Sequence, residues 1–172
     1  MRTFASRTCN GFSLLELLVV IAIVGILTGT VILGFTGADL EQYLKGEADR
    51  FAIRVELARQ HALQRNREWG IYVEEGGYRF AEFDPERGVW LERDQRPFSA
   101  VTPYDTITLR VETEGDALPT TGVKDLPQII VFSSGEITPF NLYFEPGWDS
   151  ARWVVQSDGL SSATAEREDG GV

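Results

Sequence analysis

The chain has few side chains whose type and spacing suit catalysis. His61 is its only histidine and Cys9 its only cysteine, so a nucleophile paired with an imidazole base would depend on His61. Ser133 and Ser134 precede a glycine, but the sequence contains no Gly-x-Ser-x-Gly nucleophile elbow. We interpret His61 as a residue on the surface of a helix, and we expect no catalytic residue.

Carboxylates are abundant, with 26 Asp and Glu against 16 Lys and Arg. Pairs such as Glu74/Glu75 and Asp84/Glu86 resemble an acid and a base, but in so acidic a chain they are better explained as solvated surface charge. The spacing of the aspartates does not match an EF-hand, and no phosphate-binding glycine loop is present. We therefore expect no metal, no cofactor and no enzymatic activity.

One carboxylate occupies an unusual place. Glu16 is the only charged residue between Phe12 and Phe35, a run that as a helix would extend about 36 Å, against about 30 Å for the hydrocarbon core of a bilayer. A carboxylate there costs about 2.5–3.5 kcal/mol on insertion scales, so it normally has a partner and a function. Arg2 and Arg7 precede the run, which predicts a cytoplasmic N-terminus and a single-pass protein of the inner membrane with a periplasmic C-terminal domain.

The border of this run carries a resemblance. Residues 11–16 read Gly-Phe-Ser-Leu-Leu-Glu, which resembles the class III signal sequence of type IV pilins and type II secretion pseudopilins. The resemblance implies that prepilin peptidase removes residues 1–11 by cutting between Gly11 and Phe12, and methylates the new amine of Phe12. A secretory signal peptide fits less well, because the apolar run is too long and no Ala-x-Ala-like site follows it.

The same resemblance gives Glu16 a role in assembly. After cleavage, the charged amine of Phe12 would lie at the bilayer edge, one helical turn from the Glu16 of its own chain. In a filament, a neighbour displaced along the axis would set its Phe12 amine against this Glu16, and the pairing would offset the cost of burying either charge. We therefore expect Glu16 to set the register between subunits.

The apolar run continues as an amphipathic pattern, and we expect one helix over residues 13–65. Residues 12–35 would be its transmembrane half and residues 36–66 its periplasmic half, packed on a domain. The apolar face of the second half recurs at steps of three and four: Leu40, Leu44, Ala48, Phe51, Val55, Ala58 and Ala62. Glycines near the junction of the halves lower helix stability by about 1 kcal/mol each, so bending or melting there is an open alternative.

After residue 66 the pattern changes to short β-rich runs separated by turn signals. We expect seven strands, at 68–74, 78–84, 89–92, 107–112, 128–132, 140–145 and 153–157. They form an antiparallel β domain over residues 67–160, as one sheet or a small sandwich against the helix. The acidic, small-residue segment 161–172 is expected to be a disordered tail. The predicted class is α+β with a type IV pilin-like fold.

A narrower resemblance covers most of the chain. Residues 62–71 are similar to the helix end and first strand of the GspH/FimT group, residues 132–140 to its later strand–turn–strand, and residues 157–159 to its closing turn. The resemblance is greatest to the H-type minor pseudopilin. It implies a structural subunit at or near the tip of the periplasmic pseudopilus, with other minor pseudopilins and the major pseudopilin as partners in protein secretion.

Two other functions stay open from the sequence. A minor pilin of a type IV pilus, for assembly or DNA uptake, would share the leader. Loss of Arg2 and Arg7 with the leader leaves 14 basic and 26 acidic residues, a formal charge of −12, which disfavours nucleic acid as a partner. A local basic patch would have to come from Arg65, Arg67, Arg79 and Lys124.

The remaining alternative is a membrane-anchored periplasmic binding protein that never polymerises. Its ligand groove would be lined by the tryptophans, which we instead expect in the β core: Trp69, Trp90, Trp148 and Trp153. A simple anchor does not need the Gly11–Phe12 site together with Glu16. This combination therefore favours an assembling subunit over an anchored receptor.

Overall fold

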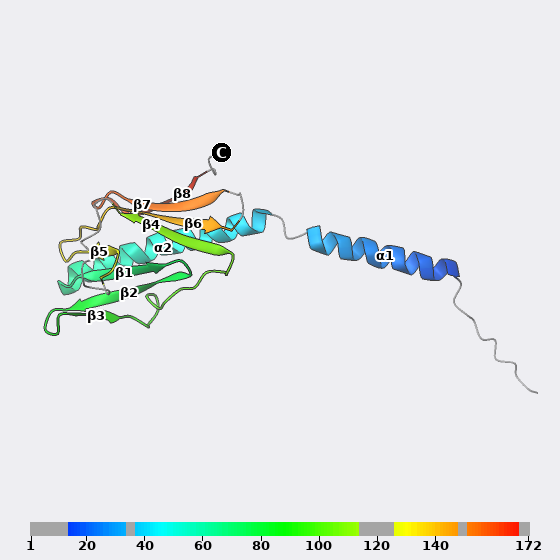
Figure 1. Cartoon of the computed structure of the whole chain (residues 1–172). Coiled ribbons are helices and arrows are strands. Elements are labelled where there is room, and N and C mark those ends of the chain that lie inside the picture. The colour runs from blue at the N-terminus through cyan, green and yellow to red at the C-terminus, as the bar shows by residue number, and fades with distance from the viewer. Residues whose placement is uncertain (1–13, 34–36, 114–125, 148–150, 169–172) are drawn as a thin grey trace, which may run out of the picture. The chain divides into compact units, whose positions relative to one another are not determined.

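The computed structural model describes residues 14–33, 37–113, 126–147 and 151–168 (Figure 1). It contains two helices, α1 (Leu14–Leu33) and α2 (Gly37–Arg65), followed by eight strands. The chain divides into two compact units, Met1–Leu40 and Glu41–Val172. The second unit therefore joins most of α2 to the β domain.

α1 belongs to the first unit and is apolar around its circumference. Its side chains from Leu14 to Val24 are exposed, and Glu16 is the acidic residue of its first turn. Among the described residues, no helix combines the length and apolarity that a membrane crossing requires. The predicted uninterrupted helix depends on residues 34–36, which lie outside the described residues. The predicted membrane span 12–35 also begins and ends at positions outside them.

α2 has one apolar stripe, as the spacing of its sequence predicts. The residues of this stripe within the second unit are at most 1% exposed: Leu44, Ala48, Phe51, Val55, Ala58 and Ala62. Ile53 lies on the opposite side of the helix and is 61% exposed. The burial of one face and the exposure of the other show that α2 packs on the β domain.

The strands form two four-stranded antiparallel sheets. The first has the order β3-β2-β1-β5 and the second the order β4-β6-β7-β8. Their bounds are β1 Trp69–Glu74, β2 Gly77–Asp84, β3 Val89–Glu92, β4 Ile107–Thr113, β5 Ile129–Val131, β6 Phe140–Pro146, β7 Arg152–Ser157 and β8 Thr164–Glu168.

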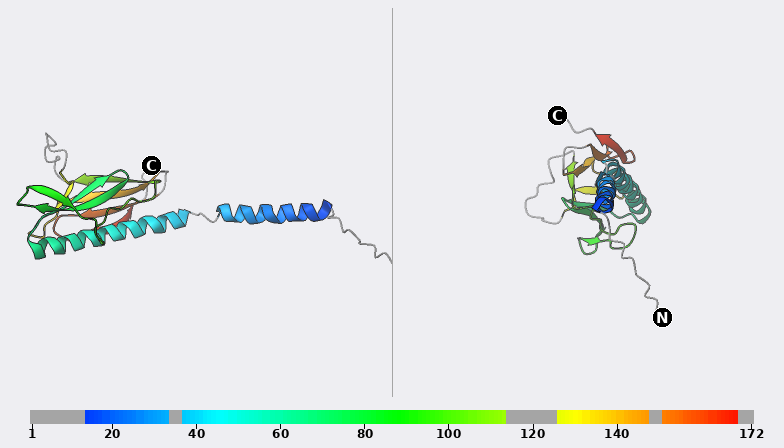
Figure 2. Two further views of the ribbon diagram at one scale, coloured as in Figure 1. Left: turned by 90° about the horizontal axis from the view of Figure 1, so that it is seen from below. Right: turned by 90° about the vertical axis from the view of Figure 1, so that its right-hand side faces the viewer.

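Both sheets pack on the same helix, which runs along them in the left view of Figure 2. The ring of Phe51 shows this most directly. Its centroid lies 4.9 Å from that of Tyr78 and 6.4 Å from that of Phe80 in the first sheet, and 6.1 Å from Phe140 and 6.3 Å from Phe144 in the second. The expected α+β architecture, in which a helix packs on antiparallel sheets, is confirmed.

The seven predicted strands are present with ends shifted by at most one residue, but the predicted disordered tail is wrong in part. Thr164–Glu168 form β8, which pairs with β7 along its whole length. The turn before it is well fixed, because Asp158 accepts hydrogen bonds from the backbone N–H groups of Leu160 (3.0 Å) and Ser161 (2.7 Å). These donors hold the pKa of Asp158 below its ordinary value.

Ion pairs then hold β8 in place. Arg152 of β7 donates to Glu168 at 2.9 Å, and Arg167 lies 3.3 Å from Glu41 of α2. A polar strand can thus pair stably when the edge of β7 offers unpaired backbone groups and its charges meet opposite charges. The β domain therefore extends to Glu168, beyond the predicted limit at residue 160.

Candidate assembly site

Glu16 is the one residue of the predicted assembly site that the structure describes. It lies in the first turn of α1, where a carboxylate interacts favourably with the helix dipole. Its neighbours Leu15 and Leu17 are 71% and 56% exposed, so the carboxylate stands in an apolar surface that other groups must cover. Gly11 and Phe12 lie outside the described residues, and their cleavage and methylation stay predictions.

A second cluster lies where α2 ends and was not predicted. Glu82 of β2 is only 4% exposed at its side chain, and three guanidinium groups meet it. Arg65, the last residue of α2, lies 3.5 Å away, Arg67 in the following link lies 3.7 Å away, and Arg93 after β3 donates a hydrogen bond to its Oε2. One signal in the sequence could have revealed this cluster. Glu82 alternates with Tyr78 and Phe80 along β2, which places its carboxylate on the inward face of the strand.

This cluster bears on the proposed basic patch. Arg65 and Arg67 lie together, but Arg79 points to the opposite side of β2, where it pairs with Glu74 at 3.9 Å and Glu92 at 3.7 Å. Lys124 lies outside the described residues. The four residues therefore do not form the single basic surface that binding to a phosphate backbone would need.

His61 is placed differently from its interpretation as a surface residue. Its ring packs against Trp69 at 5.5 Å and Phe98 at 5.3 Å, and the residue is only partly exposed. Part of the burial comes from Phe98, which follows the histidine by more than thirty residues and gives no local signal. Ser133 and Ser134 belong to the turn between β5 and β6, and His61 Nδ1 has no hydrogen-bond partner among the described residues, so this nitrogen forms no hydrogen-bonded pair with either hydroxyl.

The tryptophans form part of the domain rather than a groove. Trp69 is 2% and Trp153 9% exposed, and Trp90 packs on Phe83 with ring centroids 5.1 Å apart. Trp148 lies outside the described residues. Trp69 and Trp153 thus agree with the expectation of core packing, whereas Trp90 is half-buried and does not belong to the core.

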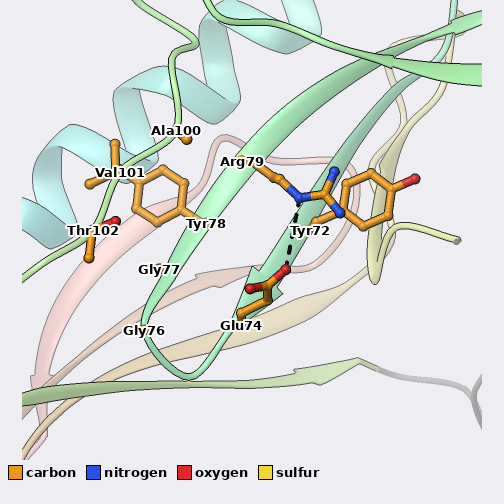
Figure 3. A pocket seen from close by; sticks show the side chains of 9 residues that line it. All are labelled: Tyr72, Glu74, Gly76, Gly77, Tyr78, Arg79, Ala100, Val101 and Thr102. Carbon is orange, nitrogen blue, oxygen red and sulfur yellow. Dashed lines mark ion pairs between the residues drawn. The ribbon is translucent and has the colours of Figure 1, made fainter.

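A shallow pocket of about 230 Å³ lies beside the β1–β2 turn (Figure 3). Arg79 stacks over the ring of Tyr72 at 3.9 Å and points its guanidinium at Glu74. On the other side of the pocket, Tyr78 pairs with Val101 through backbone hydrogen bonds of 2.9 and 3.0 Å. Its one cation is already paired, and the described residues contain no cluster of three or more metal-ligating side chains.

The sequence comparisons decide the family. The family model described as "Type II transport protein GspH" matches residues 47–160, about two thirds of the chain. The chain belongs to the GspH family. A second model, the prokaryotic N-terminal methylation motif, matches residues 6–32. Together they indicate a membrane-anchored periplasmic protein that is processed by prepilin peptidase and joins a pseudopilus.

Individual relatives agree with this placement in the GspH family. The type II secretion system protein H of Pseudomonas aeruginosa is 31% identical over 90% of this chain and 94% of its own length. The protein of the same name from Aeromonas hydrophila is 28% identical over 84% and 85%. The crystal structure of the minor pseudopilin EpsH from the type II secretion system of Vibrio cholerae has 22% identity and a TM-score of 0.57, covering 77% of this chain and 98% of its own, and so shares the fold.

Proposed function

We propose that this chain is a minor pseudopilin of a type II secretion system. It is a structural subunit of the periplasmic pseudopilus, at or near its tip, and it helps to export folded proteins across the outer membrane. The observation that carries the proposal is the order of two matches in one chain, the methylation motif at residues 6–32 and the GspH region at residues 47–160. A receptor or an enzyme needs no such combination.

The N-terminal segment supplies the anchor and the assembly chemistry. Prepilin peptidase cuts between Gly11 and Phe12 and methylates the Phe12 amine, which keeps its charge. Residues 12–35 hold the single-pass protein in the inner membrane with the β domain in the periplasm. The amine of a neighbouring subunit then pairs with Glu16. The pair is stabilising because both charges are far from bulk water and each offsets the cost of burying the other.

The β domain supplies the periplasmic body. Its two sheets and most of α2 form one compact unit, so the domain presents the surfaces of one packed body to other minor pseudopilins and to the major pseudopilin. A rigid body of this kind suits a subunit that must occupy one position in a filament. The partners follow from the family and stay part of the proposal.

The test is a secretion assay in a strain of the source organism from which this gene has been deleted. Enzymes exported by the type II system should accumulate in the periplasm, and the wild-type chain supplied in trans should restore export. Twitching motility serves as the control for a type IV pilus. Loss of twitching with normal enzyme export would instead identify a minor pilin, and loss of neither would contradict a role in either machine.

A further inference from the structure

The cluster around Glu82 carries more positive charge than its own carboxylate neutralises. Three guanidinium groups surround one carboxylate, and among the described residues Arg65, Arg67 and Arg93 form no ion pair with any other acidic side chain. The local excess is two positive charges in a chain whose formal net charge is −10. Like charges repel and are normally spread apart on a surface, so this local excess of positive charge marks a place that attracts anionic groups.

The three guanidinium groups contact a buried carboxylate on one side and are exposed to solvent on the other. The Glu82 side chain is 4% exposed, whereas those of Arg65, Arg67 and Arg93 are 54%, 39% and 38% exposed. A carboxylate accepts about four hydrogen bonds, while three guanidinium groups offer about fifteen donors. Most donors therefore remain available to a second anionic group.

The three arginines come from separate parts of the chain. Arg65 ends α2, Arg67 precedes β1, and Arg93 follows β3. Glu82 thus brings three guanidinium groups from separate segments to one place, with Arg93 hydrogen-bonded to it and Arg65 and Arg67 within ion-pair distance. Less side-chain entropy is then lost when a partner binds, which favours Arg pairs over a loose set of surface lysines.

We propose that Arg65, Arg67 and Arg93 form a docking site for a carboxylate-bearing segment of a neighbouring pseudopilin subunit. The inference rests on the proposed function, and it adds the surface and the chemistry of the partner. Arginine forks recognise carboxylates in a bidentate geometry, and Arg is enriched at the energetic centres of interfaces. Leu63, 52% exposed in the last turn of α2, supplies apolar area at the same end of the domain.

Site-specific photo-crosslinking in cells tests the site. A photoreactive phenylalanine replaces Gln64, an exposed residue beside Arg65 that leaves all three arginines intact. The control position is Glu75, which is exposed in the turn at the far end of β1. The probes are the tagged pseudopilins of the cell's own type II system, and mass spectrometry locates the crosslinked peptide.

The expected result is a crosslink from position 64 to an acidic peptide of one pseudopilin, with none to that peptide from position 75. Adding Arg65→Glu should lower its yield about tenfold, the loss expected for one charge-assisted pair. Arg87→Glu is the matched control, since Arg87 is 73% exposed in the β2–β3 turn and pairs with Asp84 outside the cluster. Replacing the partner's acidic residue with lysine should restore the crosslink to the Arg65→Glu chain.

Other results overturn the inference. They are a crosslink that Arg65→Glu leaves unchanged, a crosslinked peptide without acidic residues, or no crosslink to any pseudopilin. A melting curve of each variant shows that the fold is retained. If the deletion strain fails to secrete while Arg65→Glu secretes normally, the docking site is wrong and the proposed function stands. If the deletion itself leaves secretion intact, the proposed function fails.

Discussion

The two helices follow each other in the chain but differ in how much of their apolar surface is buried. α1 is apolar all round, and its side chains from Leu14 to Val24 are exposed. α2 has one apolar stripe, and the β domain buries the part of it from Leu44 to Ala62, with Phe51 at 0% exposure. A helix that is apolar on every side needs surroundings to cover it, whereas an amphipathic helix needs only one packed face.

This difference separates the two tasks of the molecule. The β domain and α2 complete their own core within one chain, so their stability is intramolecular. The apolar surface of α1 and the carboxylate of Glu16 must be covered by lipid or by other subunits. Substitutions in α1 should therefore change assembly and leave folding intact, while those in the buried core of α2 and the β domain should change folding first.

The largest effect is expected from Glu16→Ala. The variant should be processed and should fold normally, but its entry into filaments should fall to background, because the neighbour's amine loses its partner. Co-purification with sheared pseudopili measures this. Glu75→Ala removes the same charge from the β domain and should assemble normally. Equal incorporation of the Glu16→Ala chain would show that this glutamate does not set the register.

The next effect is expected in the core of the β domain. Phe51→Ala should lower the free energy of unfolding by about 3–5 kcal/mol, because it leaves a cavity between two sheets. Ile53→Ala, on the exposed side of the same helix, should change it by less than about 0.5 kcal/mol. Urea unfolding followed by tryptophan fluorescence measures both. Similar losses for the two variants would contradict the packing of α2 on the sheets.

Glu82→Gln should have a smaller effect on folding, about 2–3 kcal/mol. The variant keeps the shape of the side chain but removes the charge that holds three guanidinium groups together. The guanidinium groups are partly hydrated, which limits the loss. The same urea titration measures it, and Glu74→Gln, at an exposed carboxylate, is the control. A change as small as that of the control would mean that Glu82 does not organise the cluster.

The smallest effect concerns Tyr78, whose hydroxyl accepts a hydrogen bond from Arg54 at 2.9 Å. Burial raises the pKa of Tyr78 to about 12. A raised pKa means that the folded state holds the proton more tightly, so this stabilisation is complete below about pH 10 and is lost as pH rises through about 12. The melting temperature should therefore fall more steeply from pH 9 to pH 12 for the wild type than for Tyr78→Phe. Equal slopes would show that the phenol is not buried as described.

Local patterns in the sequence predicted much of this fold. The Glu-Gly-Gly turn and the alternation on either side of it predict the β1–β2 hairpin, because both signals lie within a few residues. The apolar spacing of α2 likewise predicts its buried face. The leader and the assembly residue depend on the short motif from Gly11 to Glu16, which is also local.

What the sequence did not predict depends on residues far apart in the chain. β8 is polar and has no apolar alternation, and it exists because β7 offers an edge and Arg152 meets Glu168. His61 is half-buried in part because the distant Phe98 packs on its ring, and the charge cluster needs Arg93 to meet Glu82 after a further strand. Such contacts are set by tertiary packing, which neither propensity nor periodicity encodes.

The most direct measurement is the intact mass and N-terminal sequence of the full-length protein, extracted from membranes of cells with and without prepilin peptidase. The account predicts a chain that begins at N-methylated Phe12 when the peptidase is present and retains residues 1–11 when it is absent. A chain that keeps Met1 in both strains, or that is cut elsewhere by signal peptidase, would contradict the account. The pairing of Phe12 with Glu16 would then have no chemical basis.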